Sequence, residues 1–178
     1  MADFDSPSES LKHAALRLLS ARSRSVEELR GRLLEKGFPG KEVAGCLLWL
    51  EERGYLDDSA FAQALIRDRI RFSPRSPFLL KKELTEKGVA PEIIEAALQE
   101  TMVVDGISDL DLGREAARRW VRKQGPAIRE HLLESPFSPD RERARKRLFG
   151  YLARRGFVGA AASAGLEEGE EEARRLAT

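Results

Sequence analysis

The sequence ends a segment in the same way three times, with the strings LLEKGF, LTEKGV and LARRGF. Glycine readily adopts the left-handed conformation that ends many α-helices, and the apolar residue after it can pack back on the last turn. A cation precedes each glycine, where it suits the negative end of a helix. The strings therefore predict three helices of one design, which end at Gly37, Gly88 and Gly156.

The apolar residues before the three glycines also fall into register. Leucines stand eight and four residues before each glycine, and residues four apart share one face of a helix. These leucines are Leu29 and Leu33, Leu80 and Leu84, and Leu148 and Leu152. One further apolar-periodic segment lies upstream of each helix and another downstream, so the unit is three helices, repeated three times to give nine. Aromatic residues are only 7%, and runs alternating with period two are absent, so strands are not expected.

We predict an all-α fold, a tandem array of three three-helix repeats that is elongated or curved, because a unit of about fifty residues buries little alone. The predicted parts are a disordered acidic amino terminus (1–10), three repeats (11–56, 57–102 and 109–167) and a charged tail (168–178) that is frayed or disordered.

Three details refine this plan. A 17-residue excess between the second and third glycines predicts an enlarged loop or an extra helical turn before Ser138. The string VGAAASAG predicts a last helix that is short or loosely docked, because its residues are small. Ser25 with Glu28 predicts a capping box, and Ser76 and Ser138 each precede a proline at the first helical position.

The sequence offers little for catalysis. His13 and His131 lie far apart, and phosphate-binding glycine loops, nucleophile motifs and clustered metal ligands are absent. Asp57 and Asp58 are interpreted as a helix cap rather than a metal site. Cys46 lies in an apolar run and is interpreted as buried. We expect no enzyme, no catalytic residue, no cofactor and no metal.

The apolar run around Cys46 is too short to cross a bilayer, and the acidic, polar start is no secretory signal. The chain is therefore expected in the cytoplasm, without membrane contact and as a monomer.

Basic residues are concentrated in one segment. Residues 109–165 hold 13 basic and 7 acidic residues, a balance of +6, whereas residues 166–178 hold 2 and 5, a balance of −3. A solvated helix face explains each cation taken singly, but the segment as a whole favours a polyanion or an acidic partner. Five phosphate contacts would give a salt slope of roughly −3.5 on single strands and about −4.5 on duplex. Groove-reading and stacking elements are not evident, so nucleic-acid binding should be indifferent to sequence. The candidate contact residues are Arg67, Arg71, Arg75, Lys81, Lys82, Arg114, Arg118, Arg119, Arg122, Lys123, Arg141, Arg143, Arg145, Lys146 and Arg147.

The motifs RSVEELRGRLLEKGF, GYLDDSAFAQALIRDRI, LLKKELTEKGV and IIEAAL, with LARRGF near the end, resemble the RecX regulators of bacterial RecA recombinase. The resemblance covers about residues 11–158, and the GYLDD..FA junction with the repeated KG endings carries most of it. It implies tandem three-helix repeats that bind in the groove of the RecA–DNA filament, lower its ATPase and strand-exchange activity, and can contact DNA. The last helix departs from the pattern.

Two other functions stay open at this point: a helical array that binds nucleic acid without a recombinase partner, and a scaffold that binds only proteins. We expect charge reversal at Arg118, Arg119 and Arg122 to weaken filament docking without unfolding the chain. We also expect Gly88→Ala to cost about 1 kcal/mol, through the left-handed conformation of that position.

Overall fold

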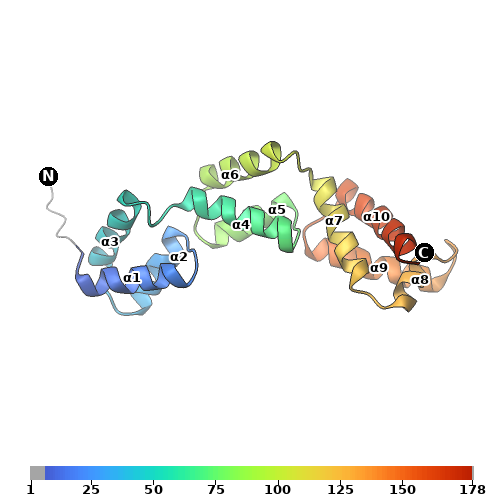
Figure 1. Cartoon of the computed structure of the whole chain (residues 1–178), viewed down its shortest axis with the longest axis horizontal. Helices are drawn as coiled ribbons and strands as arrows, with labels where there is room; N and C mark the ends of the chain where they lie inside the picture. The colour runs from blue at the N-terminus through green and yellow to red at the C-terminus, as the bar shows by residue number, and fades with distance from the viewer. Residues whose placement is uncertain (1–6, 178) are drawn as a thin grey trace. The chain divides into compact units, whose positions relative to one another are not determined.

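The computed structural model describes residues 7–177, and within this range it is all helical, without a strand (Figure 1). The fold class is therefore confirmed. Ten helices are present in this range rather than the nine expected, and the additional one is α8, which lies in the long segment before Ser138. The helices are α1 (Glu9–Ala21), α2 (Val26–Glu35), α3 (Gly40–Glu52), α4 (Asp58–Phe72), α5 (Pro77–Glu86), α6 (Pro91–Val104), α7 (Asp109–Arg122), α8 (Pro126–Leu133), α9 (Pro139–Arg154) and α10 (Gly159–Ala177).

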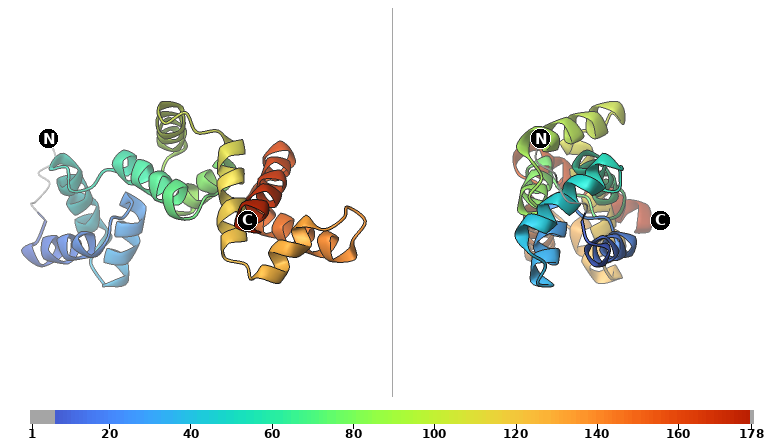
Figure 2. Two further views of the ribbon diagram at one scale, coloured as in Figure 1. Left: turned by 45° about the vertical axis from the view of Figure 1, so that its right-hand side comes forward. Right: turned by 90° about the vertical axis from the view of Figure 1, so that its left-hand side faces the viewer.

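The helices belong to two compact units. Unit 1 comprises Met1–Leu65 and Lys81–Leu98, and unit 2 comprises Ile66–Leu80 and Gln99–Thr178. Helices α4, α5 and α6 each contribute residues to both units. The division into three repeats at the boundaries given above stays a prediction. Figure 2 shows the helices from two further sides.

The leucines that define the repeated helices are core residues. All six are fully buried, as the spacing predicts. Leu29 and Leu33 pack with buried residues of α1 and α3, among them Leu11, Val43 and Cys46. Burial raises the pKa of the Cys46 thiol, which agrees with its interpretation as a buried residue.

The three helix endings adopt the predicted geometry. Gly37, Gly88 and Gly156 have φ values of 87°, 76° and 82°, in the left-handed region. In the second ending the amide of Val89 donates to the carbonyl of Leu84 at 3.1 Å, and the corresponding bonds close the first and third endings. These are the hydrogen bonds of a Schellman ending.

The second ending also contacts the start of α2. A Cβ atom added to Gly88 would lie 2.4 Å from Cβ and 2.7 Å from Cγ of Glu27. Beside this contact the Ser25 hydroxyl donates to the carbonyl of Lys87. Glycine is therefore required here for close approach as well as for its conformation, so we raise the expected cost of Gly88→Ala above 1 kcal/mol.

The third ending repeats this arrangement one repeat further along. A Cβ atom on Gly156 would lie 2.3 Å from Oγ of Ser76 and 3.1 Å from Cβ of Leu79, at the start of α5. The Ser76 amide donates to the carbonyl of Arg155 at 2.9 Å. Gly37 has no atom of another segment within 4 Å of its added Cβ among the described residues. The endings at Gly88 and Gly156 therefore each pack against the start of an earlier helix, α2 and α5 respectively.

The helix starts follow the sequence signals with one exception. Ser25 accepts from the Glu28 amide at 3.1 Å, as predicted. The Glu28 carboxylate does not complete the expected box, because Arg22 and Lys87 bind it instead. Asp57 caps α4 as interpreted, and Asp58 accepts from the Val26 amide at 2.8 Å, which ties α4 to α2.

The carboxyl-terminal helix contradicts two expectations. Helix α10 has 19 residues and packs closely along α7, and the buried side chains of Glu170, Glu172 and Ala173 lie beyond residue 167. Small residues explain this: a Cβ on Gly113 of α7 would lie 2.5 Å from the carbonyl oxygen of Ala161. The prediction of a short helix followed by a frayed tail is therefore wrong, because small residues allow two helix backbones to approach.

At the amino terminus, the predicted disordered segment lies outside the described residues up to residue 6, and Glu9 and Ser10 begin α1. None of the described helices combines the length and apolarity that crossing a membrane requires.

Candidate functional site

The basic segment includes α7, where Arg114, Arg118 and Arg122 recur every four residues and so form a basic stripe along one face. Ser108 and Asp111 form a full capping box at the amino end of α7. The apolar face of the helix, which includes Leu112, Ala117 and Val121, is buried in unit 2. The arginines occupy the remaining face, as their spacing of four residues predicts.

The end of the stripe is paired with α10. Arg122 Nε lies 2.6 Å from the carboxylate of Glu172, whose side chain is only 4% exposed. Burial alone would raise the pKa of Glu172, but hydrogen bonds and charge from Arg122 and Arg175 outweigh it and lower this pKa. The same hydrogen bond raises the pKa of Arg122. Both groups are therefore held in their charged forms.

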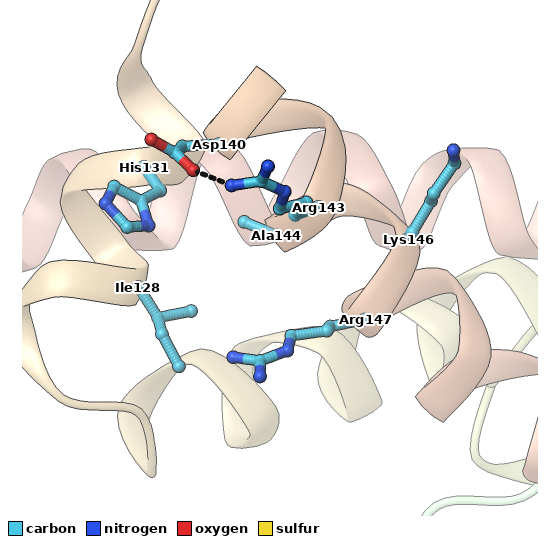
Figure 3. A pocket seen from close by; sticks show the side chains of 7 residues that line it. All are labelled: Ile128, His131, Asp140, Arg143, Ala144, Lys146 and Arg147. Atoms are coloured by element: carbon cyan, nitrogen blue, oxygen red, sulfur yellow. Dashed lines mark hydrogen bonds and ion pairs between the residues drawn. The ribbon is translucent and has the colours of Figure 1, made fainter. Parts of the chain in front are cut away.

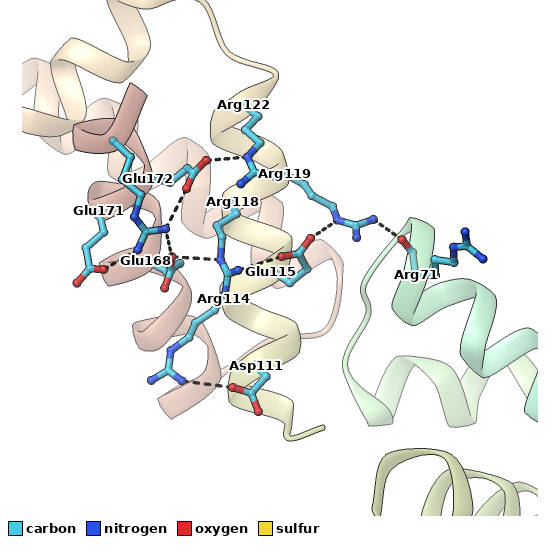
Figure 4. A network of polar contacts seen from close by, with 11 residues as sticks. Arg71, Asp111, Arg114, Glu115, Arg118, Arg119, Arg122, Glu168, Glu171 and Glu172 are labelled. Atoms are coloured by element: carbon cyan, nitrogen blue, oxygen red, sulfur yellow. Dashed lines mark hydrogen bonds and ion pairs between the residues drawn. The ribbon is translucent and has the colours of Figure 1, made fainter. Parts of the chain in front are cut away.

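The middle of the stripe is engaged in the same way (Figure 4). Arg118 lies 3.1 Å from Glu168 of α10 and 3.4 Å from Glu115 of its own helix. Arg119 binds Glu115 at 2.6 Å and donates to the backbone carbonyl of Arg71 at 2.7 Å. Arg114, at the beginning of the stripe, pairs with Asp111 at 3.4 Å.

These pairs give the arginines of α7 a structural role. Reversing the charges of Arg118, Arg119 and Arg122 would place carboxylates beside those of Glu168 and Glu172. We now expect that triple variant to destabilise unit 2, contrary to the expectation from sequence. The acidic segment that follows residue 165 is thus an internal partner of the basic segment before it.

Helix α9 divides its cations between two faces. Arg141 and Arg145 point toward α10, where both bind the buried carboxylate of Glu170. Arg143, Lys146 and Arg147 are exposed, together with Arg154, which lies seven residues after Arg147 on the same face. We call these four residues the outer face of α9.

The cations of the outer face are weakly held. Arg143 pairs with Asp140 at 2.6 Å and Lys146 with Glu142 at 2.7 Å, and all four side chains of these pairs are at least 46% exposed. Such pairs contribute about 0–1 kcal/mol each and exchange readily for another anion. Arg147 forms no ion pair or hydrogen bond with any side chain from the described part of the chain.

Arg154 of the outer face was not among the candidate residues predicted from the sequence. The continued helical spacing from Arg143 and Arg147 could have identified it.

The other predicted residues are dispersed. Arg67 and Arg71 lie on α4 and Arg75 follows it, all in unit 2. Lys81 and Lys82 lie in unit 1, where they pair with Glu95 and Glu86 of α6 and α5. Lys123 is exposed at the carboxyl end of α7.

A pocket of about 400 Å³ opens between α8 and α9, beside the outer face (Figure 3). Near its end, ligating atoms of His131, Glu134 and Asp140 lie within 4.8 Å of one another. The sequence did not indicate this group, because the segment between the two helices brings it together. Its carboxylates are already bound, that of Asp140 by Arg143 and that of Glu134 by the Ser138 hydroxyl.

Comparison with known proteins gives one consistent family. Two family models match, described as the first three-helix domain of RecX (residues 12–50) and its second three-helix domain (residues 57–98). The regulatory protein RecX of Mycobacterium sp. (strain JLS) is 36% identical over 158 residues, which cover 87% of this chain and 79% of the relative. That of Chlorobaculum tepidum is 33% identical over 155 residues, 87% of this chain and 84% of the relative.

Solved structures agree on the fold. The crystal structure of RecX from Lactobacillus salivarius superposes with a TM-score of 0.67 at 19% identity, over 91% of this chain and 96% of that one. A second crystal structure of regulatory protein RecX gives 0.64, also at 19% identity, over 89% and 70%. On this evidence of sequence and fold, the chain belongs to the RecX family of regulatory proteins.

Proposed function

We propose that this chain binds the nucleoprotein filament of bacterial RecA recombinase and lowers its ATP hydrolysis and strand exchange. It does so as a non-catalytic monomer in the cytoplasm. Membership of a family of regulatory proteins supports a regulatory role, and the filament is the partner that the resemblance to RecX implies.

The observation that carries the proposal is the outer face of α9. Arg143, Lys146, Arg147 and Arg154 form one exposed cationic stripe, whereas Arg118 and Arg122 of α7 are paired with carboxylates of α10. A filament of recombinase and DNA is a large anionic surface, to which such a stripe is complementary. Binding one filament state more tightly than another would shift its assembly or its turnover of ATP.

The test is the DNA-dependent ATP turnover of a preassembled RecA filament, measured while the chain is added. We expect a saturable fall at or below stoichiometric ratios. The double variant R147E/R154E should require at least about tenfold more protein for the same fall. Loss of two exposed cations there should leave the fold intact, because neither makes an ion pair with the described residues.

A matched control is R17E/K41E, which changes the charge equally in unit 1 at two exposed residues. If the control weakens the effect as much as R147E/R154E, net charge rather than the outer face of α9 is responsible. If the parent leaves ATP turnover unchanged, the proposal fails. Salt-dependent DNA binding that remains in that case would support the alternative, a sequence-indifferent nucleic-acid-binding array.

A further inference from the structure

One histidine and two carboxylates meet where the chain passes from α8 to α9. The ligating atoms of His131, Glu134 and Asp140 lie within 4.8 Å of one another, and within residues 7–177 this is the only group of three such side chains. His131 lies in the last turn of α8, Glu134 directly follows that helix, and Asp140 lies in the first turn of α9. Figure 3 shows the His131 ring and the Asp140 carboxylate side by side at one end of the pocket.

The segment that carries these side chains has a defined conformation. Leu132 is buried in a cluster with residues of α7, α9 and α10, which fixes the end of α8. After the helix, the Ser138 amide donates to the Ser135 carbonyl at 2.8 Å, and the Ser138 hydroxyl accepts from the Asp140 amide at 3.2 Å. Two prolines restrict the backbone of the same segment. The three side chains therefore start from fixed positions, so little conformational freedom is lost when they bind one ligand.

Each carboxylate uses one oxygen for an internal bond and keeps the other. Glu134 accepts from the Ser138 hydroxyl through Oε2, whereas its Oε1 lies 3.8 Å from Nε2 of His131. Asp140 accepts from Arg143 through Oδ1, and its Oδ2 has no hydrogen bond with the described residues. Hydrogen bonds of this kind orient the carboxylates that bind metals in proteins. Ser138 and Arg143 thus hold the two carboxylates and leave one oxygen of each for a cation.

The types of donor atom select among the divalent cations. An imidazole nitrogen with two carboxylate oxygens suits zinc, whereas magnesium and calcium prefer oxygen ligands alone. Zinc holds nitrogen and oxygen ligands at about 2.0–2.2 Å, so the ligands of a tetrahedral site lie roughly 3.4 Å apart. The 3.8 Å between His131 and Glu134 is already close to this separation. Asp140 has to approach by no more than about 1.4 Å, which rotation of its half-exposed side chain allows.

We propose that His131, Glu134 and Asp140 bind one zinc ion, with water in the fourth position on the side of the pocket. The two carboxylates balance the charge of the ion. The cations that line the pocket oppose it, so this site binds zinc reversibly, unlike the closed structural sites of zinc fingers. Bound zinc ties the end of α8 to the start of α9. This inference goes beyond filament docking, because it requires neither recombinase nor DNA.

The test is titration of the metal-free full chain with zinc, followed by the NMR signals of the histidine ring nitrogens. The chain has only two histidines, so His13, which is exposed on α1, provides an internal reference. We expect the His131 signals to shift until one equivalent is bound and those of His13 to stay in place. Competition with a chromophoric zinc chelator gives the affinity. H131A and D140N should each weaken zinc binding at least about tenfold, whereas the matched control H13A should bind as the parent does.

Both substituted side chains are partly exposed, His131 at 39% and Asp140 at 46%, so neither variant should change the circular dichroism spectrum. Unshifted His131 signals in excess zinc would overturn the proposal. So would a zinc affinity of H131A equal to that of the parent, or an equal loss in H13A and H131A. A chain that binds no zinc can still lower the ATP turnover of the filament, so this inference and the proposed function fail separately.

Discussion

The repeated glycine endings allow a matched comparison within unit 1, because Gly37 and Gly88 share a conformation and differ in their surroundings. Gly37→Ala places an alanine at φ 87°, with no other segment of residues 7–177 within 4 Å of its Cβ, which should cost about 1 kcal/mol of unfolding free energy. Gly88→Ala carries the same conformational cost. It also brings its Cβ within 2.4 Å of Glu27 Cβ, whereas carbon atoms prefer about 3.5–4.0 Å.

The contact at Gly88 is difficult to relieve. Cβ of Glu27 is attached directly to the backbone of α2, so rotation of the side chain cannot move it away. The end of α5 and the start of α2 must separate by roughly 1 Å. That movement stretches the hydrogen bond between Ser25 and the Lys87 carbonyl. Overpacking of this kind costs about 1–3 kcal/mol. The total for Gly88→Ala is therefore about 2–4 kcal/mol.

Urea unfolding followed by circular dichroism at 222 nm measures both variants, with the midpoint and slope compared to those of the parent. The expected order of stability is parent, Gly37→Ala, then Gly88→Ala. Gly156→Ala extends the comparison to unit 2, where Ser76 and Leu79 make the corresponding contact. Equal losses for Gly37→Ala and Gly88→Ala would refute the reasoning, because the contact with Glu27 would then have no energetic consequence.

Three further predictions concern stability. Gly113→Ala should lower the unfolding free energy in urea by about 1–3 kcal/mol, because its Cβ would lie 2.5 Å from the carbonyl oxygen of Ala161. The control Gly150→Ala, in the same unit, would contact only the flexible side chain of Arg154 and should raise the unfolding free energy by up to about 1 kcal/mol. Burial opposes ionisation of Glu28, but its bonds to Arg22 and Lys87 lower its pKa to about 2. The ionised Glu28 therefore stabilises the fold above about pH 4.5, and this contribution is lost as the pH falls toward 2. Glu28→Gln should therefore be about 2 kcal/mol less stable than the parent at pH 6 and equal to it near pH 2, by unfolding at each pH. Glu172→Gln should lower the unfolding free energy by about 1–2 kcal/mol at neutral pH, and an unchanged melting temperature would contradict the role of α10 as the partner of α7.

The sequence predicted those features that depend on local backbone chemistry. The endings at Gly37, Gly88 and Gly156 and the caps at Ser25 and Ser138 each arise from a few adjacent residues, and the structure confirms them. The helix faces were predictable for the same reason, since spacing along the chain fixes which side chains share a face.

Features that depend on distant partners were not predictable from a single sequence. Arg118 and Arg122 have the spacing of a free basic stripe, but their carboxylate partners lie 50 residues later, in a segment interpreted as a frayed or disordered charged tail. The alanines and glycines of α10 suggested weak packing, whereas against Gly113 they allow very close packing. Helix α8 has only eight residues, and its start at Pro126 was not distinguished from a loop.

The serines at the starts of α2, α5 and α9 determine where a further repeat could be added. The Ser25 hydroxyl and the Ser76 amide each donate a hydrogen bond to the carbonyl of the residue before a glycine ending, Lys87 and Arg155 respectively. Ser138 instead bonds to Ser135 and Glu134 of its own turn. The corresponding ending at Gly37 is open. A designed three-helix unit placed before α1 could therefore pack against the ending at Gly37. A unit placed after α10 would lack a free helix start to pack against, because Ser138 is already bonded within its own turn. The turn beside the α8–α9 pocket thus occupies, at Ser138, the groups that Ser25 and Ser76 use to contact a glycine ending.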